Sequence, residues 1–192
     1  MSFKFNPTEP IEIIHGVTIP NWLVGDLRSD HAGETGAVWI YRGILSVSFN
    51  RSVREFAERH LVSERRHLRE IEVLLPPAHR SRLLPLWRVA GFVTGALPAL
   101  ASSRTIFHTI EAVEAFVDTH YAAQIRKIGP NEGPHKSLAA IRAILVDCRG
   151  DEIDHFNEAR KLAISRPGPV GRLWCALVAL GSQLAVACAR RI

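Results

Sequence analysis

Cysteine is scarce in this sequence, and the three that occur, Cys148, Cys175 and Cys188, show no C-x-x-C spacing. Their number and spacing exclude a zinc ribbon, a rubredoxin-type four-cysteine site and a disulfide framework, and they favour a reducing compartment. The N-terminal stretch lacks the apolar core of a secretory signal and is too acidic to resemble a transit peptide. We therefore expect the chain to remain in the cytoplasm.

Strand patterns are also nearly absent, since only residues 11–19 have the pattern of an extended segment. Hydrophobic residues make up 47% of the 192 residues and charged residues 22%, which excludes disorder and collagen-like repeats. This length suits one domain over residues 1–192, with an extended N-terminal segment at 1–20. The formal net charge of +5 is compatible with an anionic partner. Because the basic residues are dispersed, a membrane surface is favoured over nucleic acid, and we expect no nucleic-acid partner.

The spacing of the eleven prolines predicts the helices, because proline breaks the hydrogen-bond ladder inside a helix. Four long helices fit between the prolines, near residues 21–48, 53–75, 103–127 and 136–164. Ser52 and Glu55 form a capping-box pattern that would begin the second of them. Helices of this number and length have the proportions of an all-α four-helix bundle.

Two further segments, residues 89–103 and 173–189, carry no charge. Both are shorter than the ~20 residues of a confident transmembrane helix. Two interpretations remain open: core helices, or apolar helices at 86–102 and 171–190 that lie in one leaflet of a membrane. On the second interpretation Trp87 and Phe92 would hold the protein on the bilayer. The arginines that would then meet anionic lipid are Arg80, Arg82, Arg88, Arg190 and Arg191.

Glu-x-x-His pairs are the most informative short motif in the chain. On a helix such a pair turns through about 300°, so both side chains share one face and can ligate one metal ion or two adjacent ones. Two of the four pairs lie outside the predicted helices and are interpreted as accidental: Glu12/His15 and Glu132/His135. Two pairs lie inside long predicted helices: Glu64/His67 and Glu152/His155. Taken singly, each could be a solvated surface pair.

A two-metal carboxylate site in a bundle needs one more glutamate from each of the other two helices, because adjacent hard cations want bridging carboxylates. The helix near 21–48 offers Glu34, and the helix near 103–127 offers Glu114 and also Glu111. Glu114 follows Glu34 by 80 positions and Glu152 follows Glu64 by 88, as a duplicated helical hairpin would produce. The pattern therefore predicts six metal ligands: Glu34, Glu64, His67, Glu114, Glu152 and His155.

These residues belong to longer motifs, which are Asp30-His31-Ala32-Gly33-Glu34, Glu64-x-x-His67-Leu68, His120-Tyr121-x-x-Gln124-Ile125 and Asp151-Glu152-x-x-His155. From about residue 24 to the C-terminus, the chain resembles the demethoxyubiquinone hydroxylase family of ubiquinone biosynthesis. The resemblance implies a ferritin-like bundle, a non-haem centre of two Fe ions, and insertion of one oxygen atom from O2 into the ring of a prenylated demethoxyquinol. It assigns the same six ligands and points to His120 and Tyr121 as catalytic residues, on the substrate side or in electron transfer. A structural tyrosine remains the alternative for Tyr121.

The resemblance also implies partners and a location. We expect a prenylated quinone, O2, a membrane lipid surface and other quinone-biosynthesis proteins as partners, at the cytoplasmic face of the inner membrane, with peripheral or monotopic attachment. Asp30 and Asp151 are expected to accept the second N–H of metal-bound imidazoles. Thr35 and Glu111 depart from the family pattern, and Glu111 would add an acid to the ligand face of its helix.

Other functions stay open at this stage. Within two-iron proteins they are a quinol oxidase of the alternative-oxidase type, a ferritin-type iron store and a rubrerythrin-type peroxidase. The peroxidase lacks its cysteines here, and two apolar segments argue against a soluble iron-storing cage. From a different class, the chain could be a metal-free helical scaffold that binds lipid quinones or protein partners.

Overall fold

The computed structural model describes residues 11–12, 18–131 and 136–192. Over these residues the helices are α1 (Asn21–Val47), α2 (Arg51–Leu74), α3 (Leu84–Ala101), α4 (Ser103–Ile128), α5 (Lys136–Ala163) and α6 (Pro169–Ala189). Short 3-10 turns occupy Pro77–His79 and Gly129–Asn131. Strands β1 (Ile11–Glu12) and β2 (Thr18–Ile19) pair antiparallel, and both lie within the segment that was expected to be extended. The two pairs interpreted as accidental involve residues 15, 132 and 135, which lie outside the described residues.

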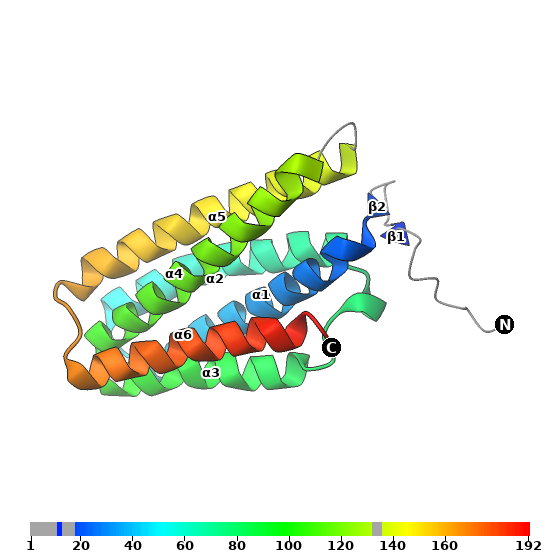
Figure 1. Cartoon of the computed structure of the whole chain (residues 1–192). Helices are drawn as coiled ribbons and strands as arrows, with labels where there is room; N and C mark the ends of the chain where they lie inside the picture. The colour runs from blue at the N-terminus through cyan, green and yellow to red at the C-terminus, as the bar shows by residue number, and fades with distance from the viewer. Residues whose placement is uncertain (1–10, 13–17, 132–135) are drawn as a thin grey trace.

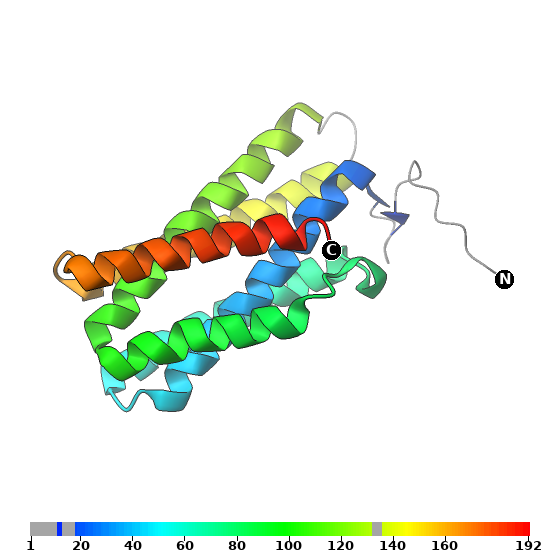
Figure 2. The same cartoon turned by 60° about the horizontal axis from the view of Figure 1, so that its bottom comes forward.

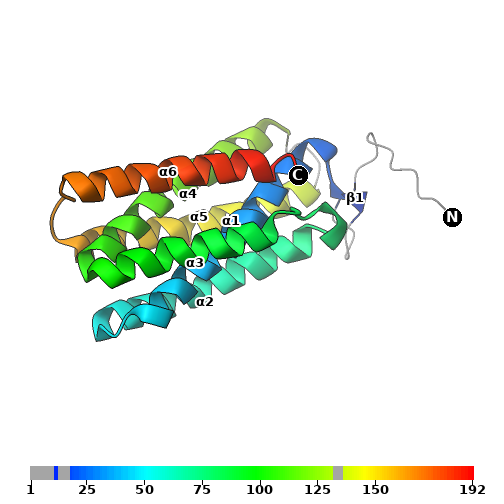
Figure 3. The ribbon, with the colours of Figure 1, turned by 90° about the horizontal axis from the view of Figure 1, so that it is seen from below.

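The bundle consists of α1, α2, α4 and α5, and the two apolar helices lie outside it (Figure 1). Helices α3 and α6 both pack against α1 and α4, so they cover the same side of the bundle (Figure 2 and Figure 3). The prediction of an all-α four-helix bundle with additional apolar helices is confirmed.

Side-chain caps set two of the helix starts. Asn50 accepts a hydrogen bond from the backbone N–H of Val53 at 3.1 Å, so α2 begins at Arg51. The predicted capping box at Ser52 and Glu55 is therefore wrong; Glu55 instead pairs with Arg51 on the surface at 2.7 Å. The start of α4 is capped by a serine in the same way, since Ser102 accepts from the N–H of Thr105.

The buried apolar side chains form two clusters along the bundle axis. One cluster includes Val38, Phe56 and Ile110, and the other includes Leu27 and Ile71. In each of the four bundle helices, the predicted glutamate ligand lies between the residues that helix gives to one cluster and those it gives to the other. The fold therefore carries a layer of acidic side chains through the middle of an apolar core.

Helices α3 and α6 are long and apolar enough to cross a membrane, although length and composition alone are a weak indication. Only 22% and 11% of their apolar windows are buried, so the interpretation as core helices is wrong. Helix α3 continues through Pro98, as the expected apolar helix at 86–102 requires. Large exposed side chains follow both helices: Leu86, Val89, Val93, Leu97 and Leu100 on α3, and Val170, Leu173, Leu177, Leu180 and Leu184 on α6.

The membrane interpretation expected Trp87 and Phe92 to hold the protein on the bilayer, but neither lies on the outward face of α3. Both are only partly exposed. Phe92 packs edge-on against Trp39 of α1, with ring centroids 6.5 Å apart, and Trp87 lines an internal cavity. These two side chains point toward the bundle, and the aliphatic residues point away from it.

Candidate metal centre

The structure brings all six predicted ligands together, although they come from four helices. Each of the six is buried. They form two overlapping groups of four, within each of which the possible ligand atoms lie within 4.8 Å of one another. Glu64 and Glu152 belong to both groups, whereas Glu34 and His67 belong to one and Glu114 and His155 to the other.

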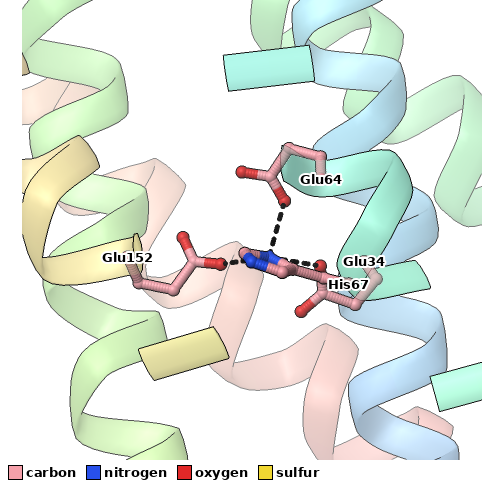
Figure 4. A group of neighbouring side chains, drawn as sticks. All are labelled: Glu34, Glu64, His67 and Glu152. Carbon is pink, nitrogen blue, oxygen red and sulfur yellow. Dashed lines mark ion pairs between the residues drawn. The ribbon is translucent and has the colours of Figure 1, made fainter. Parts of the chain in front are cut away.

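His67 lies at the centre of the first group (Figure 4). Its Nδ1 is 3.0 Å from Glu152 Oε1, 3.6 Å from Glu34 Oε2 and 3.8 Å from Glu64 Oε2. His155 has the same role in the second group, with Nδ1 at 3.2 Å from Glu64 Oε1 and 3.3 Å from Glu152 Oε2. Both imidazoles therefore present the same ring nitrogen to the carboxylates.

The donor atoms of this cluster fit a pair of divalent cations. Several of them are buried and accept or donate no hydrogen bond: Glu34 Oε2, both carboxylate oxygens of Glu64, His67 Nδ1, Glu152 Oε2 and His155 Nδ1. Burial of polar atoms that form no hydrogen bond costs free energy. Coordination of a cation by these converging atoms removes that cost. A mixed carboxylate and imidazole set suits iron, manganese and related metals rather than thiolate-seeking ones.

Outer contacts hold the two imidazoles. His67 Nε2 lies 3.1 Å from Asp151 Oδ2, and Arg66 donates to the same oxygen at 2.6 Å. His155 Nε2 lies 2.9 Å from the Ser63 hydroxyl. With Nε2 engaged in this way, Nδ1 is left free for a metal. The predicted contact of Asp151 with a ligand imidazole is confirmed, while the contacts of Arg66 and Ser63 were not predicted from the sequence.

Asp30 does not have the role expected of it. Its Oδ1 lies 2.9 Å from His120 Nε2 and accepts from Gln124 Nε2 at 2.5 Å. Neither partner belongs to the metal cluster, so Asp30 does not orient a ligand imidazole. Burial raises the pKa of its carboxyl group, although His120 opposes the rise. Asp30 instead fixes the ring of His120 beside Tyr121.

Two tyrosines bind the single glutamates in a reciprocal way. Tyr121 of α4 donates its hydroxyl to Oε1 of Glu34 on α1. Tyr41 of α1 donates to Oε1 of Glu114 on α4 at 3.2 Å. Each tyrosine follows the glutamate of its own helix by seven positions and bonds the glutamate of the other helix. Tyr41 was missed by the sequence reasoning, although its 80-residue spacing to Tyr121 repeats that of the glutamates.

A cavity of about 310 Å³ leads to this cluster. Four of the glutamates line its inner end: Glu34, Glu64, Glu114 and Glu152. Its walls come from α1, α3, α4 and α6 and are mostly apolar, with Trp87, Ala90, Leu177 and Ala185 among them. His120 and Tyr121 also line it. The volume lies at the lower end of the range for small-molecule sites.

Residues 22–189 match the family described as "Ubiquinone biosynthesis protein COQ7". The chain belongs to the COQ7 family. It is 31% identical over 169 residues to the 3-demethoxyubiquinol 3-hydroxylase of Rhodospirillum rubrum, a match that covers 86% of this chain and 76% of that protein. It is 36% identical over 134 residues to the mouse mitochondrial NADPH-dependent 3-demethoxyubiquinone 3-hydroxylase, covering 68% of this chain and 60% of that one. The yeast mitochondrial 5-demethoxyubiquinone hydroxylase is 29% identical over 154 residues, covering 70% and 64%.

The two expected departures from the family pattern, Thr35 and Glu111, belong to neither group of possible ligands. Glu111 is 3.7 Å from Arg160 Nε and 3.6 Å from His108 Nδ1, and it belongs to neither group of four. The expectation that it adds an acid to the ligand face is therefore wrong. Thr35 is buried and donates its hydroxyl to the backbone carbonyl of His31 at 2.8 Å.

Crowding of buried acids shifts the proton affinities of this COQ7 cluster in the metal-free protein. Burial raises the pKa of Glu34 to about 8, and the charges of Glu64 and Glu152 add to the rise against the effect of His67. Burial also raises the pKa of Glu114 well above its usual value. Burial alone would lower the pKa of His155, but contacts with Glu152 and Glu64 raise it to about 10. The metal-free cluster therefore holds protons at neutral pH.

Metal binding is accordingly expected to release protons and to tighten as pH rises. Glu34 is protonated below its pKa of about 8 and His155 below about 10, and a cation must displace both protons. The apparent affinity should rise up to about tenfold per pH unit for each displaced proton. Calorimetric titration with Co(II) at about pH 7, in two buffers of different ionisation enthalpy, counts the protons. A titration that released none would contradict these proton positions.

Proposed function

We propose that this chain is a two-iron monooxygenase that hydroxylates a prenylated demethoxyquinol with O2 in ubiquinone biosynthesis. The observation that carries the proposal is a cluster of unpartnered carboxylate and imidazole atoms at the inner end of an apolar cavity. Membership of the COQ7 family supports the pathway, and the printed names of the relatives support the hydroxylation.

The cavity suits a quinol ring that carries an apolar tail. Its inner end meets the glutamates, and its walls from α3 and α6 exclude water and can hold the first part of a prenyl chain. Gly33 and Gly36 of α1 leave room beside Glu34 where larger side chains would fill the cavity. The ring would then lie against the cluster, with its tail directed between α3 and α6.

The other residues near the cluster donate hydrogen bonds and orient neighbouring side chains. Two Fe(II) ions held by the six ligands would supply the reducing electrons and open coordination positions for O2, of which one oxygen atom enters the ring and the other leaves as water. Tyr121, which lines the cavity, donates a hydroxyl hydrogen bond to Glu34, and Tyr41 donates one to Glu114. His120 lies 2.9 Å from Asp30, which holds its ring at the cavity. We assign His120 and Tyr121 to the substrate side of the reaction.

The decisive experiment combines metal content with product analysis. Protein reconstituted anaerobically with Fe(II) should hold about two irons per chain. Given O2, a reductant and a short-chain demethoxyquinol, it should form a product one oxygen atom heavier, detected by mass spectrometry with labelled O2. Quinol-dependent oxygen uptake that yields only water would favour a quinol oxidase instead. Absence of specific iron binding would discard the enzyme and leave a lipid-binding scaffold.

We also propose that the protein rests on the cytoplasmic face of the inner membrane through the exposed residues of α3 and α6. Replacing Leu86, Val89 and Val93 together by serine should release most of the protein from liposomes, because about 0.8 kcal/mol is lost for each CH2 group withdrawn from lipid. The control replaces Val62 and Val73, which are exposed on α2, by serine and should leave binding unchanged. Co-sedimentation measures both, and equal release by the two variants would refute this face.

A further inference from the structure

A second cavity lies at the opposite end of the apolar helices from the C-terminus. It is about 460 Å³ in volume and forms where α3 runs into α4 and where the α5–α6 connection leads into α6. These segments meet at the left-hand end of the molecule in Figure 1 and Figure 2. None of the six proposed metal ligands lines this cavity.

The polar side chains at this cavity are basic. Arg104 and Arg166 line it, both are exposed, and within the described part of the chain neither makes an ion pair. His108 also lines it and is only 7% exposed, with a ring Nδ1 that forms no hydrogen bond. No aspartate or glutamate is among the lining residues. His108 Nδ1 lies 3.6 Å from Glu111 Oε2, and the other oxygen of this carboxylate lies 3.7 Å from Arg160 Nε.

A helix start adds to the positive character of the site. Helix α6 begins at the cavity with Gly168 as its N-cap, and no side chain caps it. Pro169 has no N–H, so the first donors are the backbone N–H groups of Val170 and Gly171, which also line the cavity. Such unpaired amides attract an anion, and the helix dipole reinforces the attraction.

The other walls are apolar and adjoin the exposed faces of α3 and α6. Leu97 and Pro98 line one side, and Val170 and Trp174 the other. The exposed aliphatic residues of both helices run up to this point, since Leu97 and Val170 belong to them. A free inorganic anion would leave these walls in water, whereas a molecule with an anionic head and an aliphatic body would cover them.

We propose that this cavity binds one anionic glycerophospholipid, with the phosphate between Arg104 and Arg166 and the upper part of an acyl chain against Leu97 and Trp174. Arginine suits the task because its planar, permanently charged group binds a phosphate through two hydrogen bonds. His108 is placed at the inner wall to donate a further hydrogen bond. A headgroup fixed here anchors one end of the α3 and α6 layer on the membrane, at a cavity that shares Trp174 with the cavity leading to the metal cluster.

A soluble short-chain lipid tests the site without a membrane. Dihexanoyl phosphatidylglycerol, kept below its micelle concentration, should bind the iron-loaded protein with one-to-one stoichiometry in a calorimetric titration. The Arg104→Gln/Arg166→Gln double variant should bind it at least about tenfold more weakly, because two charged hydrogen-bond donors are lost. The control is Arg65→Gln/Arg69→Gln, which removes the same charge from exposed positions of α2 and should bind like the parent protein.

Two further titrations decide the ligand. Dihexanoyl phosphatidylcholine should bind more weakly than the anionic lipid, and inorganic phosphate alone should not compete at similar concentrations. Inorganic phosphate that bound as tightly as the lipid would overturn the lipid assignment in favour of a free anion. Equal weakening by both arginine pairs, or no binding by the parent protein, would overturn the site itself. Circular dichroism and iron content of each variant show that the fold and the metal centre are unchanged.

Discussion

Replacing Glu64 by alanine is expected to remove both metal ions, whereas Glu114→Ala should remove only one. Glu64 belongs to both groups of four donors, so it is placed to bridge two ions, while Glu114 belongs to one group. The iron content should fall from about two per chain to near zero in the first variant and to about one in the second. Hydroxylation should fall to background in both, because the reduction of O2 needs the pair.

A neighbouring acid provides the control for this comparison. Glu111 lies on the same helix as Glu114 but pairs with Arg160 outside the cluster, so Glu111→Ala should keep about two irons. Glu64→Ala also removes the ion pairs of Glu64 with His155 and His67, so the fold of each metal-free variant is checked by circular dichroism. A variant that keeps its helical spectrum but holds no iron has lost the metal ligands and not the fold. An iron content that halved in both variants would show that Glu64 does not bridge.

The metal centre was predictable because its chemistry imposes a strict spacing on the sequence. Two Glu-x-x-His pairs and two single glutamates, alternating over four proline-free segments, leave little choice of fold or of ligands. The fold class follows from the same segments, since each is long enough for one bundle helix. Burial of all six side chains in one layer is the structural consequence of that spacing.

Features that depend on contacts between residues far apart in the sequence could not be predicted from spacing. Asp30 and Asp151 both lie near a ligand in sequence, yet only Asp151 contacts the imidazole of a proposed ligand, because it faces His67 across the α2 and α5 contact. Asp30 contacts His120 instead. Glu111 lies about one helical turn before Glu114 on the same helix, and its carboxylate approaches Arg160 and His108 and not the cluster. Local patterns misled at the start of α2 as well, where Asn50 competes with Ser52 for the cap.

Because α1 packs closely on α3, we expect that a larger residue in place of a glycine between them destabilises the protein. A Cβ atom added to Gly95 would overlap the backbone carbonyl oxygen of Ile40, and one added to Gly91 would overlap that of Gly36. A backbone cannot yield as a flexible side chain does, so Gly95→Val must push α3 away from α1. We expect a loss of about 3 kcal/mol in the free energy of unfolding, measured by denaturant titration. Gly150→Ala, at an exposed helical position with nothing within 4 Å of the added carbon, should instead stabilise by about 0.5–1 kcal/mol.

Gly95→Val also tests whether the metal centre and the cavity that leads to it depend on different helices. The six proposed ligands come from α1, α2, α4 and α5, and none comes from α3, so Gly95→Val should retain about two irons per chain. The cavity, in contrast, takes Trp87, Ala90 and Thr94 from α3, and displacement of that helix alters its walls. The KM for the quinol should therefore rise while the iron content stays constant. Loss of iron in Gly95→Val would mean that α3 supports the ligand layer directly, and an unchanged KM would mean that the cavity walls from α3 do not contact the quinol.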